Sequence, residues 1–300
     1  MAAGALDGSR ACAISDVWGL AQYFRPKVVE DALDLLKRAP LTVLAGGTDH
    51  YPARVGQPLD EDVLDITAID ALRGIEERDD QVRIGTLTSW RQICDTPLPP
   101  WFDGLKLAGR EVGGLQVQNA GTIGGNLCNA SPAADGVPPL LAMDAEVELA
   151  STRGVERLPL SRLILGNRRT ARRRDQLLTA IILPKPEKKR AAGHFLKLGA
   201  RRYLVISIVA VAANLELEDD GRVAAVRIAV GACSPVAQRL PEAERALRGA
   251  PCNPLLGSRV QPGHLSPLIP IDDVRASAEY RLDAALTLVR RTVNELAVRL

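Results

Sequence analysis

The sequence predicts an α+β protein, in which short helices and strands are mixed in the first part and a long hairpin dominates the second. Two further observations support this fold class. The first part shows no regular βαβ spacing, and residues 185–193 form a polar break beside two prolines. A chain of 300 residues is long enough for two domains. We expect a lead-in at 1–21, one domain at 22–188 and a second at 189–300.

Short elements are predicted along the first domain. A helix follows Pro26, because apolar residues recur at helical spacing until Pro40 stops it. A buried strand at 41–46 then runs into the pair Gly46-Gly47. Further strands are predicted at 63–67, 81–90, 145–151 and 177–184, and helical segments at 69–75 and 105–113.

The second domain is predicted to be a hairpin followed by helix. Apolar runs at 203–218 and 222–232 flank Asp219-Asp220-Gly221, and a D-G turn between such runs is typical of an antiparallel hairpin. A loop rich in Pro and Gly follows at 249–270. The chain then ends in a segment whose apolar residues, from Ala278 to Leu300, form one helical stripe.

The composition excludes several classes of protein. A net charge of +2 and 3% aromatic residues argue against a nucleic-acid-binding surface. The sequence has no apolar run long enough to span a membrane and no signal-peptide pattern at 1–20, which favours a cytoplasmic protein. The five cysteines are widely spaced and the three histidines lie far apart, so we expect reduced thiols and no metal site.

Two glycine-containing segments are candidates for anion binding. They are Val43–Asp49, after the first predicted strand, and Thr122–Asn126. Glycines in such loops let backbone N–H groups converge on a phosphate, and Thr and Asn add neutral donors. A single Gly-Gly pair is more often a tight turn. Two such loops favour one shared diphosphate, and neutral donors explain why residues 119–135 carry no charge before Asp135.

The same residues resemble a known family. AGGTD at 45–49, followed by NAGTIGGNLCNASPAAD at 119–135, strongly resembles the FAD-binding medium subunit of molybdenum hydroxylases, the group of xanthine dehydrogenase and carbon monoxide dehydrogenase. The resemblance covers about residues 22–298. It implies a two-lobed, PCMH-type FAD-binding domain and a smaller C-terminal domain with an antiparallel sheet and helices.

The resemblance also implies a set of cofactor-binding residues and no catalytic residue on this chain. The two loops would hold the diphosphate of a non-covalent FAD. Ser131 and Asp135 would turn toward the flavin, Lys197 would lie near the isoalloxazine, and Leu178 matches a leucine before the last strand of the first domain. The loop residues are Val43, Leu44, Ala45, Gly46, Gly47, Thr48, Asp49 and His50, and Thr122, Ile123, Gly124, Gly125 and Asn126.

Some positions depart from the family pattern or allow two interpretations. The family more often has Arg-Asn where this chain has Gln118-Asn119, an apolar residue at His50 and an acidic residue at Val205. His50 is expected to be a loop histidine, the alternative being covalent attachment of FAD. The arginines of 168–174 form either a solvated loop or a docking patch for an acidic partner. Cys128 is expected to be a small buried filler.

The resemblance implies an oxidoreductase subunit that transfers electrons. It would take them from a small subunit with [2Fe–2S] clusters and pass them to NAD+ or another acceptor. A molybdopterin large subunit would oxidise a purine, another N-heteroaromatic, an aldehyde or carbon monoxide, in a heterotrimer or a dimer of heterotrimers. Two alternatives stay open: a free-standing flavin reductase resembling enolpyruvyl-glucosamine reductase, and a cofactor-less scaffold subunit.

Overall fold

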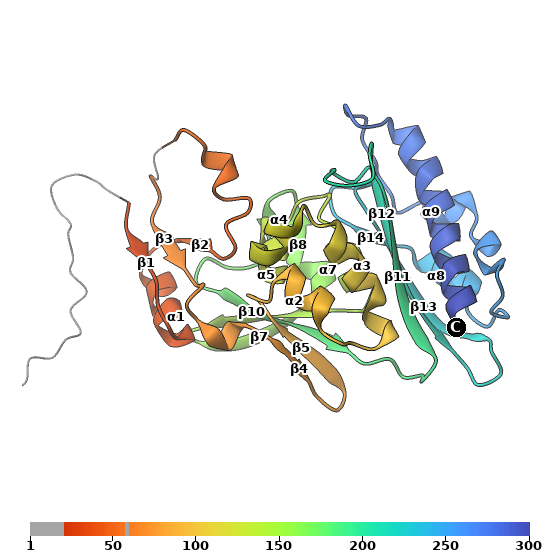
Figure 1. Ribbon diagram of the computed structural model, residues 1–300, viewed down its shortest axis with the longest axis horizontal. Coiled ribbons are helices and arrows are strands. Elements are labelled where there is room, and N and C mark those ends of the chain that lie inside the picture. Colours follow the sequence, from red (N-terminus) through yellow and green to blue (C-terminus); the bar gives the residue numbers. More distant parts are fainter. Residues whose placement is uncertain (1–20, 58–59) are drawn as a thin grey trace, which may run out of the picture.

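The computed structural model describes residues 21–57 and 60–300 (Figure 1). The predicted lead-in at 1–21 lies almost wholly outside these residues. The described chain forms a small N-terminal lobe, a larger mixed sheet with helices, and a C-terminal sheet backed by a long helix. Within these residues, no helix is long and apolar enough to cross a lipid bilayer.

The N-terminal lobe is a parallel sheet covered by one helix. Its strands are β1 (Tyr23–Phe24), β2 (Thr42–Leu44) and β3 (Val63–Asp65), in the order β1-β3-β2. Helix α1 (Val29–Arg38) lies where its apolar spacing predicted it, and it buries Ala32 and Leu36. Short 3₁₀ turns follow at Pro52–Arg54 and Asp70–Leu72. The loop after β2 extends from this lobe toward helix α5, Ile123–Asn129 (Figure 1).

The second sheet has the order β4-β5-β10-β6-β7. Its strands are β4 (Ile75–Glu77), β5 (Gln81–Gly85), β6 (Glu146–Ser151), β7 (Gly154–Pro159) and β10 (Leu177–Pro184), with the small hairpin β8 (Ile164–Gly166) and β9 (Arg169–Thr170) beside it. Strand β10 is central, and residues 177–183 are all buried and apolar except Thr179, without the alternation of a half-exposed strand.

Helices between β5 and β6 complete the core of this part. They are α2 (Trp90–Asp95), α3 (Asp103–Glu111), α4 (Leu115–Ala120), α5 (Ile123–Asn129) and α6 (Val137–Ala142), with a 3₁₀ turn at Pro100–Phe102 and α7 (Leu160–Leu163) after β7. The strand predicted at 81–90 ends at Gly85 and α2 begins at Trp90. The reason is a capping box, in which the Ser89 hydroxyl accepts from the Gln92 N–H and the Gln92 side chain accepts from the Ser89 N–H.

The C-terminal sheet lies between two helical layers (Figure 1). Its strands are β11 (Ala191–Leu198), β12 (Val209–Leu217), β13 (Val223–Gly231) and β14 (Gln238–Arg239). Helix α9 (Ala278–Arg299) packs on β11 and β12 from one side, and α3 and α6 contact the sheet from the other. Helix α8 (Pro241–Leu247) packs on β13, with 3₁₀ turns at Leu256–Arg259 and Pro262–Leu265 before α9.

The predicted hairpin is present, but its first strand begins later than the apolar run. Residues 199–208 form an irregular loop, and β12 starts only at Val209. Leu204 has a left-handed φ of 52°, and the buried Ser207 donates its hydroxyl hydrogen to Asp135. This tertiary hydrogen bond, which the apolar pattern does not reveal, holds the segment away from the sheet.

Candidate functional site

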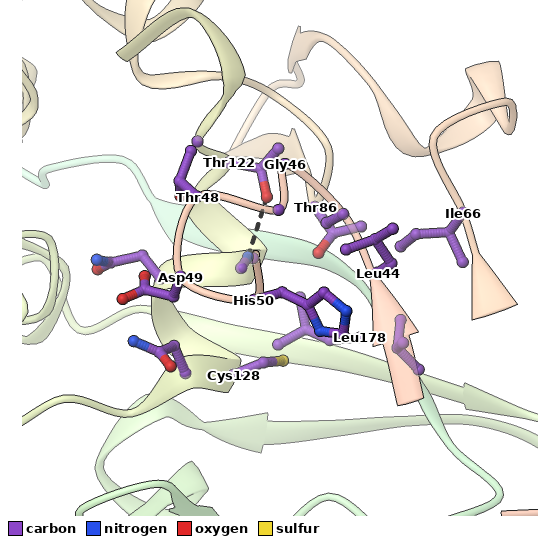
Figure 2. A pocket seen from close by; sticks show the side chains of 18 of the residues that line it. Leu44, Gly46, Thr48, Asp49, His50, Ile66, Thr86, Thr122, Cys128 and Leu178 are labelled. Atoms are coloured by element: carbon purple, nitrogen blue, oxygen red, sulfur yellow. Dashed lines mark hydrogen bonds between the residues drawn. The ribbon is translucent and has the colours of Figure 1, made fainter. Parts of the chain in front are cut away.

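The main cavity lies where the N-terminal lobe meets α5 and β10 (Figure 2). Its volume is about 570 Å³. Three segments form most of its wall: the end of β2 with the loop after it, the first turn of α5, and the start of β10. The predicted site residues that line it are Val43, Leu44, Ala45, Gly46, Gly47, Thr48, Asp49, His50, Thr122, Gly124, Gly125, Asn126 and Leu178.

The loop after β2 presents a row of backbone donors. Among the described residues, none of the N–H groups of Ala45–His50 has a hydrogen-bond acceptor. Gly47 has a left-handed φ of +69°, which turns the loop, and a Cβ on Gly46 would lie 2.0 Å from the Ala120 carbonyl oxygen. Successive free N–H groups in such a turn form a concavity suited to an anion. The loop therefore has the features of a phosphate-binding nest.

The T-I-G-G-N segment, Thr122–Asn126, was expected to offer donors to a diphosphate, but the backbone N–H groups of Ile123–Asn126 are bonded within the protein. The N–H groups of Ile123 and Gly124 donate to the carbonyls of Thr88 and Thr86, each at 3.0 Å. The Gly125 N–H donates to the Thr122 hydroxyl at 3.0 Å, as the dashed line in Figure 2 shows, and the Asn126 N–H donates to the Thr122 carbonyl. These backbone donors are used inside the protein. The segment therefore lines the cavity with glycine backbone and with polar side chains, and Ile123–Asn126 offer no free N–H groups.

Two buried polar atoms in this wall lack a hydrogen-bond partner among the described residues. They are His50 Nε2 and Asn126 Oδ1. Buried polar groups are normally paired, so unpaired ones in a cavity indicate a polar ligand. At one end the wall is apolar, formed by Leu41, Leu44, Ile66, Leu177 and Leu178. A nest, unpaired polar atoms and an apolar end together fit an elongated cofactor with a diphosphate and a flat base, as FAD has.

Asp135 and Lys197 form a buried ion pair that does not line the cavity. The Lys197 ammonium on β11 donates to Asp135 Oδ2 at 2.6 Å, and the Ser207 hydroxyl donates to Oδ1 at 2.5 Å. Burial raises the pKa of the Asp135 carboxyl, and Lys197 and Ser207 oppose this rise. Lys197 also donates to the Glu111 carbonyl, next to Val112 of the cavity wall. The pair therefore lies next to the part of the cavity wall formed by Val112.

Two other predicted site residues have local roles here. Ile123 is fully buried in the core. The Ser131 hydroxyl accepts from the Ala133 N–H at 3.3 Å and closes the turn that leads to Asp135. The structure does not bring these residues into the cavity, so their contact with a cofactor stays a prediction.

Several cavity residues were not predicted. Arg168 and Arg172, from the arginine cluster, line the wall, as do Thr86, Trp90 and Val117. Of these residues, only Arg168 and Arg172 could have been suggested by the sequence, through the clustering of arginines. The expectation for Cys128 was wrong, because its side chain is exposed to the cavity rather than packed in the core. The neighbouring protein atoms nevertheless raise the pKa of its thiol through desolvation, and the nearby Arg172 lowers it.

Family profiles identify both parts of the chain. Residues 19–186 match the FAD binding domain in molybdopterin dehydrogenase. This chain belongs to that family. Residues 194–296 match the CO dehydrogenase flavoprotein C-terminal domain, so the C-terminal sheet and α9 correspond to that domain. The FAD subunit family thus confirms the resemblance, the α+β fold class, the cofactor FAD and the role of an oxidoreductase subunit.

Individual relatives match along almost the whole chain. The xanthine dehydrogenase FAD-binding subunit of Escherichia coli O157:H7 is 30% identical over 288 residues, covering 93% of this chain and 97% of that protein. The nicotine 6-hydroxylase medium subunit of Paenarthrobacter nicotinovorans is 31% identical over 283 residues, covering 93% and 98%. In structure, reconstituted CO dehydrogenase from Oligotropha carboxidovorans superposes with a TM-score of 0.84 at 26% identity, covering 95% of this chain and all of that chain.

Proposed function

We propose that this FAD-binding subunit transfers electrons within a heteromeric molybdenum hydroxylase. It receives them from a small subunit with [2Fe–2S] clusters and delivers them to NAD+ or another acceptor. A large molybdopterin subunit oxidises the substrate, and the subunits assemble as a heterotrimer or a dimer of heterotrimers. The observation that carries the proposal is the nest of unpaired N–H groups at Ala45–His50 inside a cavity of FAD-like polarity.

The residues of this chain hold and orient the cofactor. Bound FAD supplies the redox chemistry, since it can take up single electrons and release them in pairs. The N–H groups of Ala45–His50 hold the diphosphate, and Leu41, Ile66 and Leu178 exclude water around the adenine. Lys197 and Asp135 place a paired charge at the flavin end. The matching family favours this interpretation over a free-standing reductase or a cofactor-less scaffold.

We place the substrate of the whole enzyme among N-heteroaromatic compounds. The two relatives named above are, by their names, enzymes of xanthine and nicotine, and both substrates contain nitrogen heterocycles. Purines belong to the same class. Aldehydes and carbon monoxide, the other substrates that the resemblance implies, are less favoured, because the glyceraldehyde dehydrogenase medium chain matches at 28% identity and the CO dehydrogenase medium chains at 26% and 28%.

Purification of the native complex through a tag on this chain tests the proposal. We expect two co-purifying subunits, a flavin spectrum, and iron and molybdenum in the same fraction. Acid precipitation should release all flavin into the supernatant, since we predict non-covalent FAD. A lone, yellow, active chain without iron or molybdenum would contradict the proposal, and flavin in the acid pellet would contradict non-covalent binding.

A further inference from the structure

His50 is a polar residue at a position where the family pattern has an apolar one. Its ring lies in the cavity between the loop after β2 and the side chains of Leu44 and Leu178 (Figure 2). The side chain is only 11% exposed. If the side chain only filled space here, an apolar residue would suit the position better than histidine, because a buried ring nitrogen without a hydrogen bond is unfavourable.

Neighbouring groups orient the ring. Glu61 Oε1 lies 4.0 Å from His50 Nδ1, and the Thr42 hydroxyl and the Arg54 guanidinium both contact the Glu61 carboxylate. Arg54 also donates to the His50 carbonyl at 3.1 Å. A carboxylate on the Nδ1 side favours the tautomer with its proton on Nδ1, which leaves a lone pair on Nε2. That atom is buried and has no partner among the described residues.

The position of the ring indicates which part of the cofactor it meets. The His50 N–H belongs to the nest that we assign to the diphosphate, while its ring points toward the apolar end formed by Leu44, Ile66 and Leu178 (Figure 2). In FAD, a ribose links the diphosphate to the adenine. The resemblance implies that the isoalloxazine lies near Lys197, whose ion pair with Asp135 is next to Val112 of the cavity wall.

We propose that His50 Nε2 accepts a hydrogen bond from a ribose hydroxyl of the adenosine half of FAD. This inference rests on the FAD site proposed above and adds a specificity-determining residue to it. A hydroxyl can donate to the unpaired nitrogen, and the Glu61 carboxylate near Nδ1 favours the tautomer that can accept this hydrogen bond. The same placement puts His50 away from the isoalloxazine, so it does not serve as a point of covalent flavin attachment.

Nucleotide binding to the purified, flavin-free full-length chain tests this role. Calorimetry with ADP, 2′-deoxy-ADP and 3′-deoxy-ADP should show that the wild-type chain binds ADP about 10-fold more tightly than one of the deoxy analogues. H50L should bind both FAD and ADP about 10-fold more weakly and bind ADP and that analogue equally. H50Q, whose amide oxygen can accept the same hydrogen bond, should stay within about 3-fold of the wild type.

A matched control and the contrary results complete the experiment. H264L changes a histidine in the 3₁₀ turn Pro262–Leu265, outside the cavity wall, and should leave all affinities unchanged. The proposal is overturned when H50L keeps the preference for ADP over the deoxy analogue, or binds FAD and ADP as tightly as the wild type. A wild-type chain that does not bind FAD would instead contradict the proposed function.

Discussion

At the scale of single residues, two adjacent glycines have opposite reasons to be glycine. A Cβ on Gly124 would lie 1.7 Å from the Thr86 hydroxyl oxygen, inside the protein. A Cβ on Gly125 would meet only the Thr122 hydroxyl, at 2.9 Å, and otherwise faces the cavity. Gly124 is therefore required by packing, whereas Gly125 keeps space open for a ligand.

This contrast predicts separable effects. G125V should remove most of the bound flavin while costing about 1 kcal/mol of stability, because the Thr122 cap is disturbed but no core contact is lost. G124V should destabilise the fold by about 1–3 kcal/mol or more through overpacking. The ratio of flavin to protein absorbance and the free energy of unfolding in urea measure the two effects.

Comparison of the two variants controls for general damage. G124V protein that remains folded should still bind flavin better than G125V does. Full flavin content in G125V would show that Thr122–Asn126 is not part of the FAD-binding wall.

The sequence could predict about half of the cavity residues but not their partners. The two glycine loops were predicted from their residue types, and the structure brings them together. That the donors of Ile123–Asn126 are already used by Thr86, Thr88 and Thr122 could not be predicted, because Thr86 and Thr88 belong to another segment. The exposure of Cys128 to the cavity likewise depends on the packing of α5 against its neighbours.

At the scale of elements, β11 and α9 are joined by a buried histidine. His194 Nε2 lies 2.5 Å from Glu295 Oε2, and the His194 ring is almost inaccessible to solvent. Burial lowers the pKa of His194, and the nearby Arg299 acts in the same direction, while Glu295 opposes them. The neutral ring is therefore favoured in the folded state.

A pH dependence of stability follows from this lowered pKa. Below about pH 6.5, the ordinary pKa of histidine, the unfolded chain binds a proton at this residue that the folded chain resists. The free energy of unfolding should therefore fall as the pH decreases from 6.5, by at most about 1.4 kcal/mol for each unit of the shift. H194Q should flatten this part of the curve, as urea denaturation at several pH values would show.

H264Q serves as the control for this experiment, since His264 lies in the 3₁₀ turn Pro262–Leu265 and takes no part in the His194–Glu295 contact. An identical pH slope in H194Q and the wild type would show that His194 does not determine it.

Elements with a strong local pattern were predicted well, and those defined by tertiary contacts were not. Helix α1, strands β6 and β10 and helix α9 lie close to their predicted ranges, since each carries its own apolar period. Helix α2 was missed because its capping box follows an apolar alternation that continues past Gly85. The apolar run at 203–208 was assigned to a strand, although the Ser207–Asp135 hydrogen bond places it in a loop.

At the scale of the whole molecule, the site is built by parts that are distant in sequence. The loop with free backbone donors comes from the N-terminal lobe, another part of the wall from α5, and part of the apolar wall from β10 (Figures 1 and 2). Strand β11 of the C-terminal sheet brings Lys197 to Asp135. Residue types could predict the cofactor class and the family, but only the structure separates the loop with free donors from the loop without them.

The most direct test of this account is the structure of the chain with FAD bound. We expect the diphosphate oxygens to lie about 2.7–3.2 Å from backbone nitrogens of Ala45–His50, with the adenine against Leu44, Ile66 and Leu178. The backbone nitrogens of Ile123–Asn126 should keep their hydrogen bonds to the protein. A diphosphate bound to the α5 backbone or to Arg168 and Arg172, with the Ala45–His50 nest left free, would contradict the account.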